Sequence, residues 1–293
     1  MNEKHKKWFK LGRYWLGYGL FAILVGYSII KAPDELWHLQ PIWLLATLFF
    51  IGLMLVVELA QFFVFLHHYQ RPWRADLLTP LRITTRKSIL NATLPAQSGT
   101  LLLLRMVTDT YQLAWHDYIR FIVVATILML FISVLAVAGL VLDTAVFIAL
   151  LAVVVSISLW ARRFSDRSHY GDSFLLLLTG SGVYLCRVLI FWTILRATGT
   201  AVRFVDASYF AIITNTLAQF PITPGNIGVR EALFGLLSPY LTLPSSVGVL
   251  VGAIFQVLRI ALYAIIMAAS DFIYNRRRSQ AQSARPADHA APD

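Results

Sequence analysis

Long uninterrupted runs of apolar residues dominate the chain and alternate with shorter polar connections. Six of these runs are long enough to cross a bilayer, because about 17–25 helical residues span its hydrocarbon core. They cover residues 14–30, 41–66, 119–141, 144–161, 173–197 and 246–270. Two more polar regions, 67–118 and 198–245, interrupt this series. The pattern predicts an all-α integral membrane protein with about six transmembrane helices.

Basic residues are concentrated in the connections that this pattern places on one side of the membrane. They cluster at 4–13, 71–87, 162–167 and 276–278, whereas the connections at 31–40 and 142–143 carry one lysine and three acidic residues. Because basic loops stay in the cytoplasm, both termini are predicted to be cytoplasmic and the protein to lie in the cell (inner) membrane. The net charge of +10 is then explained by clusters beside lipid headgroups, and no nucleic-acid partner is expected.

This orientation divides the chain into two related halves. Region 67–118 must begin and end inside and region 198–245 outside, and their apolar content favours re-entrant helical hairpins that dip into the membrane and return. Each half then consists of two spans, a broken segment and a third span. The two halves have opposite orientations in the membrane, which is an inverted repeat. The predicted divisions are a basic cytoplasmic N-terminus, a first membrane repeat, a second membrane repeat and a disordered cytoplasmic tail, at 1–13, 14–142, 143–275 and 276–293.

Both broken segments carry an asparagine, a proline, a glycine and an arginine in the same order. These residues are Asn91, Pro95, Gly99 and Arg105 in the first segment and Asn215, Pro221, Gly225 and Arg230 in the second. Proline lacks an N–H group and clashes with the preceding turn, so each helix is expected to end there. Thr223 and Pro224 then predict a cap and a first helical position for a new helix that runs toward Leu237.

The two breaks are expected to form a site at the centre of the protein. Non-helical backbone at membrane depth is tolerated only inside protein or beside a watery cavity. Unpaired N–H groups and a positive helix end would favour an anion there, and in a bilayer the expected anion is phosphate. The predicted loop residues are Pro95, Gly99, Pro221, Pro224, Gly225, Asn226 and Gly228.

Charged residues within the apolar runs are the other candidates for this site. Arg187 and Arg259 lie mid-run and would be unfavourable against lipid, so both are expected to face the interior. The candidate headgroup-binding residues are Arg187, Arg230, Glu231, Arg259, Arg105, Asn91 and Asn215. The alternatives are structural: a buried ion pair of Glu58 with Arg187 or of Glu231 with Arg259, or a place for Arg230 and Glu231 at the wet end of the short helix.

Several kinds of chemistry have no support in the sequence. It contains no HExxH, GxSxG, P-loop or acidic metal cluster. The single cysteine, Cys186, excludes a disulfide framework within the chain. We therefore predict no catalytic residue, no metal and no cofactor. The small-residue pattern GVLVG at 248–252 is expected to pack helices.

The two motifs resemble those of a known family. N-x-x-x-P-x-x-x-G at 91–99 and, above all, P-I-T-P-G-N-I-G-V-R-E at 221–231 are similar to the flippase-like membrane domain of lysylphosphatidylglycerol synthases. That domain also occurs as stand-alone bacterial membrane proteins of uncharacterised function. The pattern of spans extends the resemblance over about residues 10–275. Asn226 departs from the family's motif, in which a second glycine is expected after Pro–Gly.

The resemblance implies a protein that handles amphiphilic lipids, whether a modified phospholipid or, as in relatives, a polyprenyl or hopanoid lipid. No counterpart of the soluble aminoacyl-transferring domain is present, so we do not expect lysyl-lipid synthesis or enzyme activity. The predicted function is an inner-membrane lipid translocase or a lipid-binding subunit of one. Its expected partners are membrane lipids, with a lipid-synthesis protein or a second copy of the chain as further candidates. A regulatory or scaffolding protein, and an intramembrane enzyme with Glu231 as general base, stay open as alternatives.

Overall fold

The described part of the chain is entirely helical in its regular structure. The computed structural model describes residues 18–31, 39–69, 77–94, 98–141, 167–220 and 222–283. Within these ranges, four helices are long and apolar enough to cross a membrane: α3 (Pro41–His68), α6 (Trp115–Val141), α8 (Arg167–Ala197) and α11 (Ser245–Ser283). A shorter apolar helix covers Tyr18–Lys31. This architecture is typical of a multi-pass membrane protein and confirms the all-α class.

The four long helices correspond to four of the six predicted runs. Two of them begin several residues before the apolar run does, since α6 starts at Trp115 and α8 at Arg167. The first run is a helix from Tyr18 onward, while 144–161 and the basic segment 1–13 lie outside the described residues.

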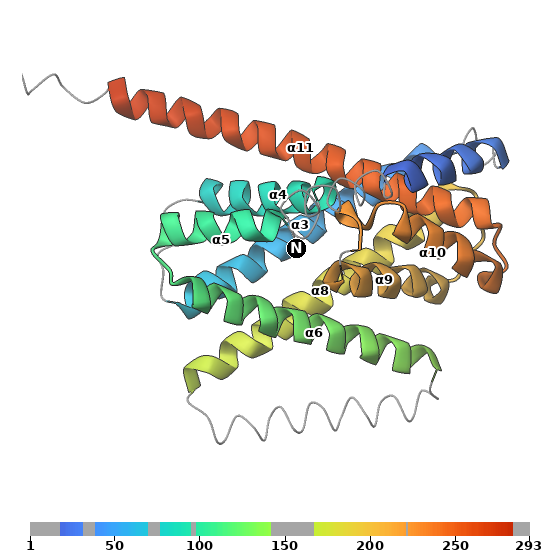
Figure 1. Cartoon of the computed structure of the whole chain (residues 1–293), viewed down its shortest axis with the longest axis horizontal. Coiled ribbons are helices and arrows are strands. Elements are labelled where there is room, and N and C mark those ends of the chain that lie inside the picture. The colour runs from blue at the N-terminus through green and yellow to red at the C-terminus, as the bar shows by residue number, and fades with distance from the viewer. Residues whose placement is uncertain are drawn as a thin grey trace, which may run out of the picture.

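The end of α11 changes the expected boundary of the tail. Because α11 remains helical through Ser283, residues 276–283 extend this helix instead of starting a disordered segment. Its C-terminal part projects beyond the rest of the bundle (Figure 1). Residues 284–293 lie outside the described residues.

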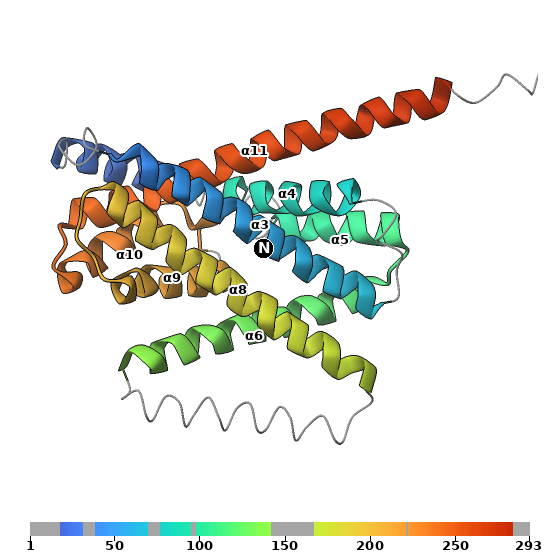
Figure 2. The ribbon, with the colours of Figure 1, turned by 180° about the vertical axis from the view of Figure 1, so that it is seen from behind.

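Helices α3 and α8 pack closely near the centre of the molecule, where they lie side by side (Figure 2). The buried hydroxyl groups of Thr47 and Thr193 share a hydrogen bond of 2.9 Å. Gly182 lies against Val57, where an added Cβ would come within 3.2 Å of a methyl group. Small residues and hydroxyl groups let helices approach closely in a membrane, where burial of apolar surface does not drive helices together.

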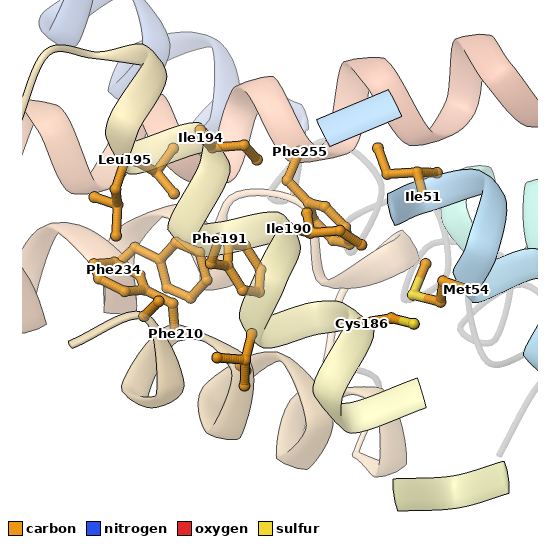
Figure 3. Close-up of a cluster of buried hydrophobic side chains, with 14 of the residues drawn as sticks. Ile51, Met54, Cys186, Ile190, Phe191, Ile194, Leu195, Phe210, Phe234 and Phe255 are labelled. Atoms are coloured by element: carbon orange, nitrogen blue, oxygen red, sulfur yellow. The ribbon is translucent and has the colours of Figure 1, made fainter. Parts of the chain in front are cut away.

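A cluster of aromatic rings joins α8 to the last third of the chain (Figure 3). The ring centroid of Phe191 lies 5.3 Å from that of Phe234 and 5.0 Å from that of Phe255. Phe210 meets Phe234 edge to face at 4.6 Å. Each such pair contributes about 0.5–1.5 kcal/mol beyond its area burial. The cluster therefore holds in place the helices that carry Arg230 and Arg259.

Shorter helices correspond to the two broken segments. They are α4 (Leu78–Thr93), α5 (Ser98–Tyr111), α9 (Phe204–Gln219), the single turn η1 (Pro224–Asn226), α10 (Val229–Leu237) and the turn η2 (Ser238–Leu241). Helices α4 and α5 lie side by side (Figures 1 and 2). Pro95 and Pro221 lie outside the described residues. Nevertheless α4 and α9 end just before these prolines, so the predicted helix ends are confirmed.

The long helices expose large apolar side chains on their outer faces. Helix α6 lies at the edge of the bundle away from α11 (Figures 1 and 2) and exposes Val123, Val124, Ile127, Val134 and Val137. Helix α3 likewise exposes Ile42, Leu45, Phe49 and Val56. Apolar surface of this extent is unfavourable in water and is suited to contact with lipid chains.

Candidate functional site

The breaks between the short helices touch each other inside the molecule. Gly225 of η1 lies so close to α4 that an added Cβ would overlap the backbone carbonyl of Ala92. Gln256 of α11 donates a hydrogen bond to the same carbonyl oxygen at 3.4 Å. A glycine is therefore needed at 225, both for this close approach and because its φ is 56°.

Asn226 has a structural role that explains its presence where a second glycine is expected. Its φ of 55° lies in the left-handed region, which asparagine tolerates better than most residues. Its Oδ1 accepts the N–H of Ile222 at 2.9 Å, and its Nδ2 donates to the carbonyl oxygen of Leu217. The side chain thus bridges the break and satisfies backbone groups that a helix would have paired.

The second helix of this segment starts later than predicted. Thr223 and Pro224 open only the single turn η1, and the Thr223 hydroxyl donates to a carbonyl oxygen four residues later at 2.7 Å. Helix α10 begins at Val229, after Gly228 with a φ of 82°. The Glu231 carboxylate accepts the Gly228 N–H at 2.6 Å. It therefore occupies the positive helix end that was expected to face a ligand.

A cavity of about 270 Å³ lies beside the two breaks. The long helices and both sets of short helices contribute to its lining. The charged side chains that line it are Glu58, Lys87, Arg187, Arg230 and Arg259. Helix α6 contributes one mainly apolar stripe, formed by Tyr118, Phe121, Ile122, Ala125, Thr126 and Met129. The cavity is therefore amphipathic, with charged groups and an apolar helix face in the same space.

Arg230 and Glu231 form a buried ion pair within the described structure. Arg230 Nη2 lies 3.1 Å from Glu231 Oε1 and donates a second hydrogen bond to Gln256 Oε1 at 2.9 Å. The two residues are only 2% and 0% exposed, so the alternative that places them at the wet end of the helix is wrong. The guanidinium also lies 5.2 Å from the ring centroid of Phe255. Arg230 thus has several partners besides any ligand.

Arg187 and Arg259 are less completely paired. Arg187 is 9% exposed, and its buried Nε and Nη1 have no hydrogen-bond partner among the described residues. Arg259 donates from Nη2 to Gln256 Oε1 at 3.2 Å, but its buried Nε has no partner there either. A buried donor without a partner costs about 1–3 kcal/mol, and more when it is charged. Both residues line the cavity, so an anion in it would lie beside two cations that have unused hydrogen-bond donors.

The two ion pairs considered as structural alternatives are not formed between the described residues. Glu231 pairs with Arg230 and not with Arg259. Glu58 Oε2 accepts hydrogen bonds from Ser88 at 3.3 Å and from Tyr263 at 3.5 Å, instead of an ion pair with Arg187. Arg187 and Glu58 thus both line the cavity without forming an ion pair with each other.

Asn91 and Gly99 close the turn between α4 and α5. The Asn91 side chain accepts the N–H of Thr100 and donates to its hydroxyl group, both at 3.2 Å. An added Cβ at Gly99 would overlap the backbone carbonyl of Lys87. Asn91 also lines the cavity, so it lies at the site while holding the hairpin together.

The remaining predicted site residues do not line the cavity. Asn215 donates from Nδ2 to Ser133 Oγ at 3.2 Å and so ties α9 to α6. Arg105 has an 83% exposed side chain and lies 3.7 Å from Asp109 on the same helix. Glu231 lies behind Arg230. The glycines of the GVLVG pattern pack as expected, since an added Cβ at Gly248 would overlap α10.

A scan against protein-family models and searches of curated proteins and solved structures found no match. The family resemblance of the motifs therefore stays a prediction. No group of three or more His, Cys, Asp or Glu residues that could hold a metal ion occurs within the described ranges.

The site also contains residues that sequence reasoning missed. Lys87 lines the cavity from α4, and Tyr263 lines it from α11. Their spacing from predicted site residues could have identified them, because residues three or four apart share a helix face. Lys87 precedes Asn91 by four residues, and Tyr263 follows Arg259 by four. Gln256 precedes Arg259 by three and bonds both Arg230 and Arg259.

Proposed function

We propose that this protein is an integral inner-membrane lipid translocase of the flippase-like kind. It binds the anionic headgroup of a phospholipid or a polyprenyl- or hopanoid-type lipid in the central cavity and moves it between the leaflets. The observation that carries the proposal is the pair Arg187 and Arg259, two residues of the cavity lining that have buried nitrogen atoms without hydrogen-bond partners in the described structure. Buried cations of this kind within membrane helices are typical of substrate pathways.

The edge of the cavity supports entry from the bilayer. Leu94, at the end of α4, and Ala218, at the end of α9, both line the cavity and are exposed. The apolar side chains that follow α9, Phe220 and Ile222, are also exposed. A headgroup could enter past this apolar edge while its acyl chains stay in lipid.

The short helices fit a re-entrant arrangement. With 16 residues each, α4 and α9 are about 24 Å long, and α5 with 14 residues is about 21 Å, at 1.5 Å per residue. A hydrocarbon core of about 30 Å is too thick for them to cross. In the proposed topology, each broken segment therefore enters the membrane and returns, and the two halves of the chain form the inverted repeat.

The hydrogen bonding of Glu231 favours binding over catalysis. Its Oε2 accepts the Gly228 N–H and its Oε1 accepts from Arg230. A general base needs a free oxygen that can reach the proton of a substrate. The two oxygens of Glu231 are engaged in holding the start of α10 and the Arg230 side chain.

Transport in proteoliposomes tests this proposal. The protein would be reconstituted with a fluorescent phospholipid, and loss of fluorescence after addition of a membrane-impermeant quencher would report exchange between leaflets. We expect Arg187→Gln and Arg259→Gln to slow the exchange at least about tenfold, the equivalent of 1.4 kcal/mol. Arg105→Gln is the matched control, because this exposed arginine lies away from the cavity. Equal rates for all variants would refute the proposal and favour the regulatory or scaffolding alternative.

A further inference from the structure

The charges around the cavity do not balance. Among the described residues, the cationic side chains that line it are Lys87, Arg187, Arg230 and Arg259. Two carboxylates offset them: Glu58 in the lining, and Glu231 directly behind Arg230 at 3.1 Å. Four positive and two negative charges leave an excess of two positive charges.

The unpaired donors lie on two of the three cavity cations that have no ion pair in the described structure. Arg230 is matched by Glu231, whereas Glu58 accepts hydrogen bonds from hydroxyl groups and has no cation within ion-pair distance among the described residues. Arg187 and Arg259 have no carboxylate within ion-pair distance in the described structure, and their free atoms are Nε and Nη1 of the first and Nε of the second. These donors come from different helices, α8 and α11, so they can bind different oxygens of one ligand.

Two classes of lipid phosphate differ in charge and in acceptor oxygens. A phosphodiester, as in most phospholipids, has a single negative charge and two non-bridging oxygens. A phosphomonoester carries about −1.5 to −2 charges at pH 7 and presents three strong acceptor oxygens. Because charges interact more strongly in a low dielectric than in water, the second negative charge matters most in a buried site.

We propose that the cavity selects a dianionic head, a phosphomonoester or a diphosphate, over a phosphodiester. The inference rests on the proposed lipid-binding function and names the substrate class of the same site. A dianion neutralises the excess of two positive charges and gives acceptors to the free nitrogens of Arg187 and Arg259. A phosphodiester neutralises only one of the two charges.

Competition between two lipids of identical acyl chains tests the proposal. The full chain would be placed in nanodiscs that contain equal amounts of phosphatidic acid, a phosphomonoester, and phosphatidylglycerol, a phosphodiester. Native mass spectrometry then measures which lipid stays bound. We expect phosphatidic acid to be retained at least about tenfold more than phosphatidylglycerol. Arg187→Gln and Arg259→Gln should each bring the ratio close to one, whereas Arg105→Gln should leave it unchanged.

A charge-conserving variant and a soluble competitor distinguish the possible outcomes of this experiment. Arg187→Lys keeps the charge, so it should keep most of the preference and shows that the site is still folded. Glycerol 3-phosphate, added as a soluble phosphomonoester, should displace little phosphatidic acid if the ligand is a lipid. Displacement at equal concentration would overturn the assignment to a lipid. Retention of phosphatidylglycerol at least as strong as that of phosphatidic acid would overturn the dianion proposal while leaving the translocase intact. Retention of neither lipid would overturn both.

Discussion

The buried pair of Arg230 and Glu231 is the feature whose removal should affect stability most clearly. Their charged atoms are 3.1 Å apart, and the two residues are 2% and 0% exposed. Replacing Glu231 by Gln leaves an uncompensated guanidinium in the interior. Removal of one partner of a buried ion pair costs about 3–5 kcal/mol. We expect about 3 kcal/mol for Glu231→Gln, because Gln256 still accepts a hydrogen bond from Arg230 at 2.9 Å.

A second substitution separates the charge from the helix cap. Glu231→Ala also removes the acceptor of the Gly228 N–H, whose bond is 2.6 Å. Loss of such a cap adds about 1 kcal/mol. Glu231→Ala should therefore be less stable than Glu231→Gln by this amount.

Unfolding by sodium dodecyl sulfate in mixed micelles measures these free energies. The double variant with Arg230→Gln and Glu231→Gln completes a mutant cycle, and we expect a coupling of at least about 2 kcal/mol between the two sites. The exposed pair of Arg105 and Asp109, 3.7 Å apart, is the control and should give about 0.5 kcal/mol or less. A wild-type stability of Glu231→Gln, or strict additivity in the double variant, would refute the reasoning.

Three further substitutions test the structural roles described above by the same unfolding measurement. Gly225→Ala should lower the free energy of unfolding by about 2 kcal/mol or more, because the new Cβ overlaps the Ala92 carbonyl and the φ of 56° disfavours alanine. Stability equal to wild type would contradict the close contact between Gly225 and α4. Asn226→Ala should lower the free energy of unfolding more than Asn226→Gly does, because glycine accommodates the φ of 55° once the side-chain hydrogen bonds are lost and alanine does not. The reverse order would argue against the left-handed conformation at this position. Asp271→Asn weakens the ion pair with Arg86 at 2.8 Å, and because these groups are partly exposed we expect a loss of at most about 1 kcal/mol in the free energy of unfolding. A loss of several kcal/mol would contradict this expectation.

Local signals were sufficient for the class of protein and for the ends of several helices. The length of an apolar run decides whether it can cross a bilayer, and four predicted runs correspond to α3, α6, α8 and α11. Proline ends a helix by its own geometry, so α4 and α9 end next to Pro95 and Pro221 as predicted. These properties belong to single segments and need no knowledge of their neighbours.

Charge pairing could not be predicted in the same way. The sequence suggested pairs of Glu58 with Arg187 and of Glu231 with Arg259, but Glu58 binds hydroxyl groups and Glu231 pairs with Arg230. Glu58 on α3 meets Ser88 of α4 and Tyr263 of α11, so its partners depend on distances of a few ångströms between separate helices, and Arg230 and Glu231, neighbours on α10, are buried together against Gln256 of α11. Such distances depend on how the helices pack and not on the residues of any one of them.

The two arginines of the repeated motif show the same limit. Arg105 follows Gly99 by six residues and Arg230 follows Gly225 by five. Helix α5 runs without a break from Gly99 to Arg105, whereas left-handed residues separate Gly225 from α10, where Arg230 is the second residue, so similar motifs place their arginines differently. Arg105 is exposed, whereas Arg230 is buried at the cavity. The sequence by itself determined a helical membrane protein with two broken segments; only the tertiary structure decided which charges meet at their junction, because it alone sets the rotation and contact of the helices.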